Sequence, residues 1–165
     1  MTYQEALQRT ASIAERAPEP GSEEEVRAIA AFSDFVRQMR AETIADNARR
    51  VYAEEAYFND TVKELEGSEA IADYLAESLE ATEEVNVEVV DVARSGIDYY
   101  FRWVMDIKFR KLNGGDWARS EGMSQIRFDG NGQVVLHRDF WDAAGGLFAY
   151  MPVVGSLIRW IKGRI

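Results

Sequence analysis

The spacing of apolar residues changes near the middle of the chain. Before residue 85, apolar residues recur every three or four positions, as in helices that bury one face. From residue 85 to residue 142 they alternate with polar residues, which is the period of strands with one apolar and one solvated face. The pattern therefore predicts an α+β domain in which helices are followed by an antiparallel sheet.

The first half of the chain is predicted to hold a short helical arm and three further helices. The arm, a helix over residues 2–16, ends at residues 17–21, where two prolines and a glycine interrupt helical hydrogen bonding. We expect it to be loosely attached. The next helix begins after Ser22, because Ser22 and Glu25 have the spacing of a capping box. The remaining helices are predicted at 43–55, followed by a short extended piece at 57–60, and from residue 67 onward.

The second half is predicted to form a four-stranded meander. Its hairpin turns are expected at residues 113–115 and 129–132, where asparagine, aspartate and glycine tolerate positive φ. The helices are expected on one face of this sheet. The resulting division of the chain is an arm at 1–21, a domain at 22–142 and a C-terminal extension at 143–165.

Two stretches of the domain resemble the nuclear transport factor 2-like superfamily. Residues 51–60 and 67–71 are similar to its opening of late helix, short strand, glycine and helix. Residues 126–142, which read IRFDGNGQVVLHRDFWD, resemble its closing hairpin. The resemblance implies a cone-shaped, cystatin-like α+β fold in which helices pack on a curved antiparallel sheet and enclose a pocket.

The superfamily includes ketosteroid isomerase, polyketide cyclases of the SnoaL type, limonene epoxide hydrolase, scytalone dehydratase and proteins that only bind ligands or partners. The fold alone therefore assigns no reaction. Relative to the isomerase, Asp60 matches the carboxylate base, whereas Phe35 or Val36 stands at the tyrosine and Ser124 at the aspartic acid that stabilise the oxyanion. Steroid isomerisation is not expected, because this electrostatic support is missing.

The two aspartates and bridging arginine of the epoxide hydrolase are also incomplete. Asp139 matches one aspartate and Asp106 could match the other, but Val104 stands where the arginine is needed. Asp106 shares its strand face with Arg102 and Lys108, so we expect it to face solvent.

The remaining candidates for chemistry are Asp60, His137 and Asp139. His137, Asp139 and Trp141 are two residues apart on one predicted strand, so their side chains point to the same side, which faces the cavity in the resembling enzymes. His137 beside Asp139 could accept and donate a proton near neutral pH, and Asp60 could supply a second acid or base. Two alternatives stay open: a buried polar pair that orders the core, and an aspartate that closes a turn at 59–61.

The predicted pocket wall combines aromatic and apolar residues with a serine. Its members are Phe35, Tyr57, Phe101, Trp103, Met105, Ser124, Ile126 and Trp141. An ordinary core is the alternative for the aromatic row on the strand 99–109.

Composition narrows the function classes. A net charge of −10 disfavours binding to nucleic acid, and the absence of cysteine with a single histidine leaves no zinc-type cluster. We therefore expect no metal and no cofactor. The N-terminus lacks the apolar run of a signal peptide, and no stretch reaches the ~20 apolar residues that span a bilayer, so a cytoplasmic protein is expected.

The extension at 143–165 differs from the rest in charge. Its three charged residues, Arg159, Lys162 and Arg164, give it a charge of +3. Because the whole chain carries −10, residues 1–142 carry −13. Residues from Pro152 onward have the spacing of an amphipathic helix. Packing within the chain or a homodimer contact is favoured over contact with a membrane surface, because the rest of the protein is acidic.

Together these observations predict a SnoaL-like pocket protein for a small apolar or aromatic molecule. The candidate reactions are isomerisation, cyclisation and dehydration, all of which require acid–base catalysis. The alternative is a non-catalytic ligand-binding or dimerisation module.

Overall fold

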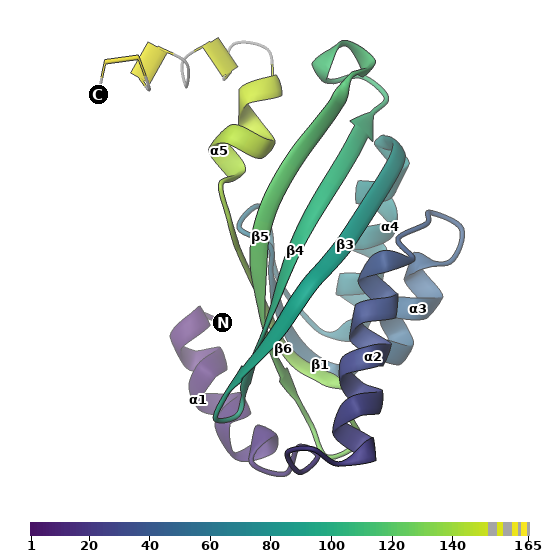
Figure 1. Cartoon of the computed structure of the whole chain (residues 1–165), viewed down its shortest axis with the longest axis vertical. Coiled ribbons are helices and arrows are strands. Elements are labelled where there is room, and N and C mark those ends of the chain that lie inside the picture. The colour runs from purple at the N-terminus through teal and green to yellow at the C-terminus, as the bar shows by residue number, and fades with distance from the viewer. Residues whose placement is uncertain (152–154, 157–159, 162, 165) are drawn as a thin grey trace.

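The computed structural model describes residues 1–151, 155–156, 160–161 and 163–164 (Figure 1). The helices are α1 Tyr3–Ala14, α2 Glu23–Arg37, α3 Ile44–Val51, α4 Ser68–Glu80 and the short α5 Ala143–Gly146, with 3-10 turns at Asn113–Gly115 and Phe148–Tyr150. The strands are β1 Tyr52–Asn59, β2 Glu64–Glu66, β3 Thr82–Ser95, β4 Asp98–Phe109, β5 Trp117–Phe128 and β6 Val134–Trp141.

The sheet has six strands in the order β2-β1-β6-β5-β4-β3. The predicted meander is confirmed, because β3 to β6 pair antiparallel in sequence order. The sheet as a whole is mixed, however, since β1 runs parallel to β6 and pairs antiparallel with β2. The predicted helix at 43–55 is wrong beyond Val51: from Tyr52 the chain pairs with β6, and this tertiary pairing overrides the helical spacing.

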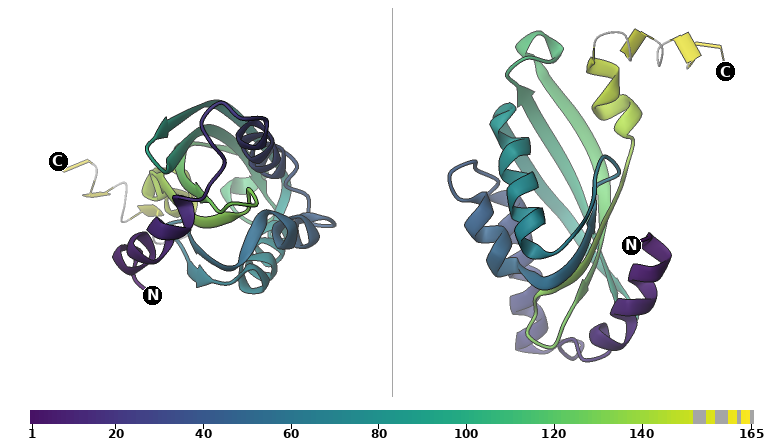
Figure 2. Two further views of the ribbon diagram at one scale, coloured as in Figure 1. Left: turned by 90° about the horizontal axis from the view of Figure 1, so that it is seen from below. Right: turned by 180° about the vertical axis from the view of Figure 1, so that it is seen from behind.

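The sheet is strongly curved, and α2, α3 and α4 cover its concave face (Figures 1 and 2). The apolar stripe of each helix meets the inward residues of the strands in one continuous core. Its largest fully buried members include Phe32, Ile44, Tyr52, Ile71, Tyr99, Phe101, Ile126 and Phe128. The cone-shaped α+β fold is therefore confirmed.

Helix α1 lies on the opposite, outer face of the sheet, against β5 and β6 (Figure 2). The expected loose attachment is wrong, because Ala6, Thr10 and Ala14 are buried there. The guanidinium of Arg127 on β5 donates to the carbonyl oxygen of Leu7 at 2.7 Å and to Thr10 Oγ at 3.1 Å. The expectation that all helices share one face is wrong as well. The outer face of β6 is apolar at Leu136, and α1 packs on it and buries it.

The start of α2 is fixed by a polar cluster around Glu25. Ser22 Oγ accepts from the Glu25 amide at 3.1 Å, as the capping pattern predicts. The Glu25 carboxylate does not close the capping box. It accepts instead from the Gly21 amide at 2.5 Å, Tyr99 Oη at 2.6 Å and Arg94 Nη1 at 2.7 Å. This residue therefore ties the arm, α2 and β4 together.

The stability of the protein is expected to fall above pH 10 because of Tyr99. Burial and the bond to Glu25 raise the pKa of Tyr99 to about 12, compared with about 10 in an unfolded chain. The native state then holds a proton that the unfolded state has lost, so this contribution is complete below pH 10 and disappears as the pH rises through 12. At pH 11 the loss should be about 1 kcal/mol in urea unfolding. A Tyr99→Phe variant with the same pH profile would contradict the assignment.

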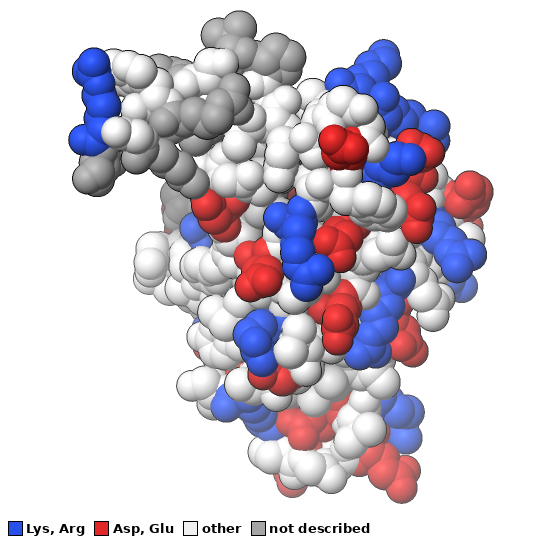
Figure 3. Space-filling view, turned by 45° about the horizontal axis from the view of Figure 1, so that its top comes forward, with Lys and Arg blue, Asp and Glu red and all other residues white. Residues whose placement is uncertain are grey.

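The outer face of β3 to β5 carries charged side chains in alternation (Figure 3). Arg102 pairs with Asp91 at 2.7 Å and Arg119 pairs with Asp106 at 3.3 Å. The prediction that Asp106 faces away from the core is confirmed, so it cannot serve as an inward catalytic aspartate.

The chain after β6 turns across the wide end of the sheet. Asp142 Oδ1 accepts from the Gly145 amide at 3.0 Å and caps α5. Most of the predicted helix after Pro152 lies outside the described residues. No helix in the described part of the chain has the length and apolar character needed to cross a membrane.

Candidate functional site

The candidate site is centred on His137, which strand β6 holds on the concave face of the sheet. His137 is buried, and its ring lies edge-on to Phe32 and Phe58. Its Nδ1 is 2.6 Å from Tyr52 Oη, and its Nε2 is 2.8 Å from Asp139 Oδ1. The predicted neighbourhood of His137 and Asp139 is thus present, and Tyr52 joins it from β1.

The hydrogen-bond directions follow from the phenol of Tyr52. Burial, and then the negative charges of Asp139 and Asp60, raise the pKa of Tyr52 well above its usual value, so the phenol stays protonated. Tyr52 therefore donates to Nδ1 of His137, and we assign the ring proton to Nε2, which donates to Asp139. In this arrangement both ring nitrogens are occupied, so His137 orients Asp139 and is screened from a ligand by its burial.

Among the described residues, the donors to the Asp139 carboxylate all reach one of its two oxygens. Oδ1 accepts from His137 and from Ser124 Oγ at 2.5 Å, and Ser124 Oγ in turn accepts from Trp103 Nε1 at 2.9 Å. No group in the described part of the chain donates to Oδ2. Because the Asp139 side chain is 16% exposed, Oδ2 is the atom that a ligand or water can reach.

Asp60 closes the turn after β1, as one of the two alternatives predicts. Its Oδ1 accepts from the amides of Val62 at 2.9 Å and Lys63 at 2.7 Å. Its Oδ2 accepts from Tyr74 Oη of α4 at 2.6 Å, and its carbonyl oxygen accepts from Trp141 Nε1 at 2.8 Å. The carboxylate therefore accepts three hydrogen bonds, and the proton it could exchange is that of Tyr74.

Asp60 and Asp139 face a common region. Burial, the bond to Asp60 and the negative charges of Asp60 and Asp139 together raise the pKa of Tyr74. Tyr74 thus lies within electrostatic reach of both carboxylates and stays a neutral phenol. Tyr74 is absent from the predicted site, because nothing in its helical spacing distinguishes it from a core residue.

The register of the strands gathers most of the predicted wall around Asp139. Phe101 lies opposite Ser124, and Ser124 lies opposite Asp139. Phe101, Trp103 and Ile126 are buried, whereas Met105, Asp139 and Trp141 are half-buried. The deep end of the wall is therefore core, and the accessible end lies toward Met105 and Trp141. Phe35 packs edge-on against Tyr52 within the core, with their ring centroids 5.6 Å apart.

Tyr57 departs from the prediction and lies on the outer face of the sheet. It packs with Ala6 and Leu136, and its hydroxyl donates to Glu64 at 2.9 Å. The reason is the alternation of side chains along β1: Phe58 pairs with His137 on the concave side, so its neighbour must point outward.

Gly122 on β5 makes room for two tryptophans of the wall. A Cβ atom at this position would lie 2.5 Å from Trp103 Cζ2 and 2.9 Å from Trp141 Cβ. A Gly122→Ala variant is therefore expected to be less stable by about 1–3 kcal/mol, because the indole of Trp103 must move. Urea unfolding would measure the loss. A fully stable Gly122→Ala variant would show that the wall is loosely packed.

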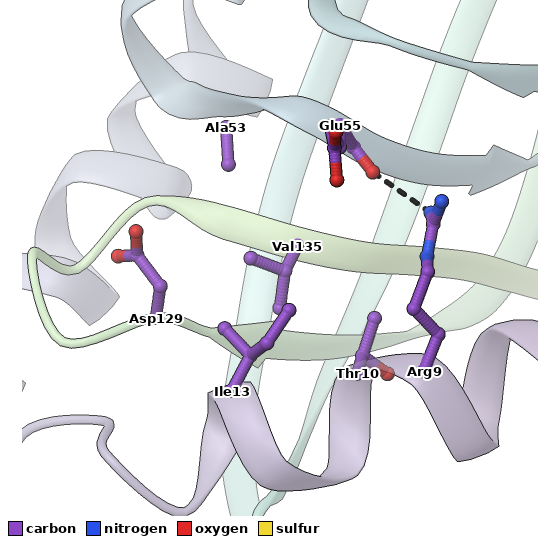
Figure 4. A pocket seen from close by; sticks show the side chains of 7 residues that line it. All are labelled: Arg9, Thr10, Ile13, Ala53, Glu55, Asp129 and Val135. Atoms are coloured by element: carbon purple, nitrogen blue, oxygen red, sulfur yellow. Dashed lines mark hydrogen bonds between the residues drawn. The ribbon is translucent and has the colours of Figure 1, made fainter.

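The two described cavities lie away from these residues. A cavity of about 220 Å³ separates α1 from the outer face of β1 and β6 (Figure 4). Arg9 crosses its rim and donates to the carbonyl oxygen of Glu55 at 2.8 Å (Figure 4). A second, of about 150 Å³, lies between α2 and α3. Neither cavity is lined by Asp60, His137 or Asp139. Within the described residues, no cluster of three metal-binding side chains is found.

The comparison with known families agrees with this fold. Residues 29–137 match the sequence model of the SnoaL-like domain, which is most of the chain. The chain belongs to the SnoaL-like domain family. No protein of curated function matches it.

Solved structures similar to this SnoaL-like domain include proteins of several activities. A limonene epoxide hydrolase-like enzyme of M. tuberculosis has a TM-score of 0.61 at 14% identity and covers 87% of this chain and 99% of its own. An inferred SnoaL-like polyketide cyclase of Jannaschia sp. has a TM-score of 0.61 at 17% identity, covering 76% and 90%. A protein of Catenulispora acidiphila with a ketosteroid isomerase-like fold, in complex with trimethylamine, has a TM-score of 0.61 at 14% identity, covering 73% and 88%. At these identities the likeness shows the fold alone.

Proposed function

We propose that this SnoaL-like domain binds a small apolar or aromatic molecule at the accessible end of its concave face and uses Asp139 as a general base. The observation that carries the proposal is the unequal use of the two Asp139 oxygens. His137 and Ser124 fix Oδ1, while Oδ2 is left for a substrate proton. A carboxylate held in this way is positioned before the substrate arrives, which is what proton transfer requires.

The proposed step is balanced without a co-reactant. Asp139 Oδ2 takes a proton from a carbon or hydroxyl group, and the electron pair stays on the substrate as an enolate, alkene or nucleophilic oxygen. The protonated carboxyl group then returns the proton to another atom of the substrate, or to a departing hydroxyl group as water. Isomerisation, cyclisation and dehydration all fit this scheme. Tyr74 donates its phenol hydrogen to Asp60, so its oxygen faces this region as an acceptor.

The comparisons support this class of reaction without choosing within it. The similar structures include an epoxide hydrolase and an inferred polyketide cyclase, and both names describe reactions on small organic molecules. The alternative of a dimerisation module has no apolar interface on the outer face of β3 to β5, because that face carries ion pairs such as Arg102 with Asp91. Homodimerisation elsewhere on the molecule stays a prediction.

A thermal-shift screen tests the proposal. Wild type, Asp139→Asn and the surface control Asp116→Asn would be compared against small carbonyl compounds, aromatic polyketide-like molecules, terpenes, epoxides and amines. A ligand at a hundredfold excess over its dissociation constant stabilises the native state by about 2.7 kcal/mol. We expect hits that Asp139→Asn weakens and Asp116→Asn leaves unchanged. Hits that are indifferent to Asp139, or a screen without hits, would contradict the proposed site.

A further inference from the structure

The inward side chains of β4, β5 and β6 near Asp139 carry negative charge and no lysine or arginine among the described residues; the inward Arg94 of β3 is paired with Glu25 at the start of α2. On β4, β5 and β6 the basic residues fall on the outward positions of the alternation, where Arg102, Arg119 and Arg127 form ion pairs. The inward positions carry Asp139, and Asp60 approaches from the β1 turn. Among the residues that the structure describes, neither carboxylate has a lysine or arginine within ion-pair distance.

The donors around the two carboxylates are all neutral groups. Asp60 accepts from two backbone amides and the phenol of Tyr74. Asp139 accepts from the hydroxyl of Ser124 and the imidazole of His137. A protonated His137 would need to donate from Nδ1, which would displace the phenol hydrogen of Tyr52, and no second acceptor for that hydrogen is described. The two negative charges are therefore solvated by dipoles but not compensated by a cation.

The charges near Asp139 also act on Tyr52, the tyrosine linked to it through His137. On the inner side, the charges acting on the pKa of Tyr52 are those of Asp139 and Asp60 alone, and both raise it. On the outer side, Arg138 lowers the pKa of Tyr3 and of Tyr57 and so opposes the effect of burial. The charges around Tyr52 are thus negative, whereas Tyr99, elsewhere on the concave face, lies beside the cation of Arg94.

We infer that the molecule bound at Asp139 carries a positive charge, as a protonated or quaternary amine on an apolar body. This inference rests on the proposed function, since it names the ligand class of the same site. A cation would meet both carboxylates in a half-buried setting, where charges are poorly screened. An anion would be repelled by both, and a neutral molecule of the same shape would gain only the apolar contacts with Met105 and Trp141.

A pair of ligands that differ only in charge tests the inference. Choline and 3,3-dimethylbutan-1-ol have the same shape, with nitrogen in one replaced by carbon in the other. Each has a sharp nine-proton methyl signal for saturation-transfer NMR. We expect the full-length protein to bind choline at least about tenfold more tightly, and 3,3-dimethylbutanoate least of the three. In Asp139→Asn the preference should fall to about threefold or less, whereas Asp116→Asn should retain it.

The outcomes separate this inference from the function on which it rests. If the uncharged alcohol binds as tightly as choline or more tightly, and Asp139→Asn abolishes this binding, the inference of a positively charged ligand is wrong. The proposed site at Asp139 would still be supported. A choline preference that Asp139→Asn does not change would place the cation elsewhere and overturn the inference. Binding of none of the three probes to the wild type would overturn it as well, and the broader ligand screen would then decide whether the site itself stands.

Discussion

Replacing Arg127 by alanine is expected to lower the free energy of unfolding by about 3–5 kcal/mol, because it leaves a nearly buried carboxylate without its cation. The Arg127 side chain is 8% exposed and its partner Asp98 is 18% exposed. Arg127 Nε donates to Asp98 Oδ1 at 2.6 Å, and Nη1 donates to the carbonyl oxygen of Leu7 at 2.7 Å. After the change Gln125 is the one described side chain that still donates to Asp98, and α1 loses the bonds of Arg127 to Leu7 and Thr10 while Tyr3 still donates to Gln125.

A surface ion pair of the same sheet provides the control. Arg102 and Asp91 are 59% and 56% exposed, so Arg102→Ala should cost less than about 1 kcal/mol. Urea unfolding of both variants, with Asp98→Asn and the Arg127→Ala/Asp98→Asn double variant, gives the coupling energy between Arg127 and Asp98. Most of the loss in Arg127→Ala should be recovered in the double variant, since no buried charge then remains. Equal effects of Arg127→Ala and Arg102→Ala would show that the buried ion pair contributes no more than the exposed one.

Asp139→Asn is expected to reduce turnover of a substrate of this site by about 10²–10⁴-fold while leaving the fold intact. The amide oxygen can accept from His137 and Ser124 as Oδ1 does, so both positioning bonds survive. The amide nitrogen then occupies the outward position, where a proton acceptor becomes a donor. Stability should stay within about 1 kcal/mol of the wild type, because the change also removes a negative charge that faces Asp60.

Measurements of turnover and unfolding on the same preparation separate chemistry from structure. The control Asp116→Asn makes the same substitution on the β4–β5 turn and should change neither quantity. Ser124→Ala keeps the carboxylate but removes one of its two donors, so it should lower turnover less than Asp139→Asn does. Unchanged turnover in Asp139→Asn would refute the assignment of the base. Global unfolding of Asp139→Asn would instead favour the structural alternative for the His137–Asp139 pair.

The parts of the site that the sequence predicts are those that depend on local geometry. His137, Asp139 and Trp141 share a face because strand side chains alternate, and this holds wherever the strand lies. The turn at Asp60 follows from side-chain acceptors next to backbone amides, which is likewise local. Tyr57 is predicted on the wrong side of the sheet because the sequence does not show which of two neighbouring strand residues, Tyr57 or Phe58, faces His137.

The partners of these residues come from distant parts of the chain. Tyr52 reaches His137 across 85 residues, and Trp103 reaches Ser124 across 21. Tyr74 reaches Asp60 only because α4 packs on β1. No local periodicity specifies such pairs, since each depends on strand order and on which helix face is buried.

By itself, the sequence determined the α+β class, the hairpin turns, the family and the shared face of His137 and Asp139, because hydrophobic period, turn chemistry and side-chain alternation act over a few residues. Only the tertiary structure decided that α1 packs on the outer face, that β1 runs parallel to β6, and that His137 and Ser124 hold Asp139 through one oxygen. These features depend on contacts between distant segments, whose free energy is gained only when the whole sheet has formed.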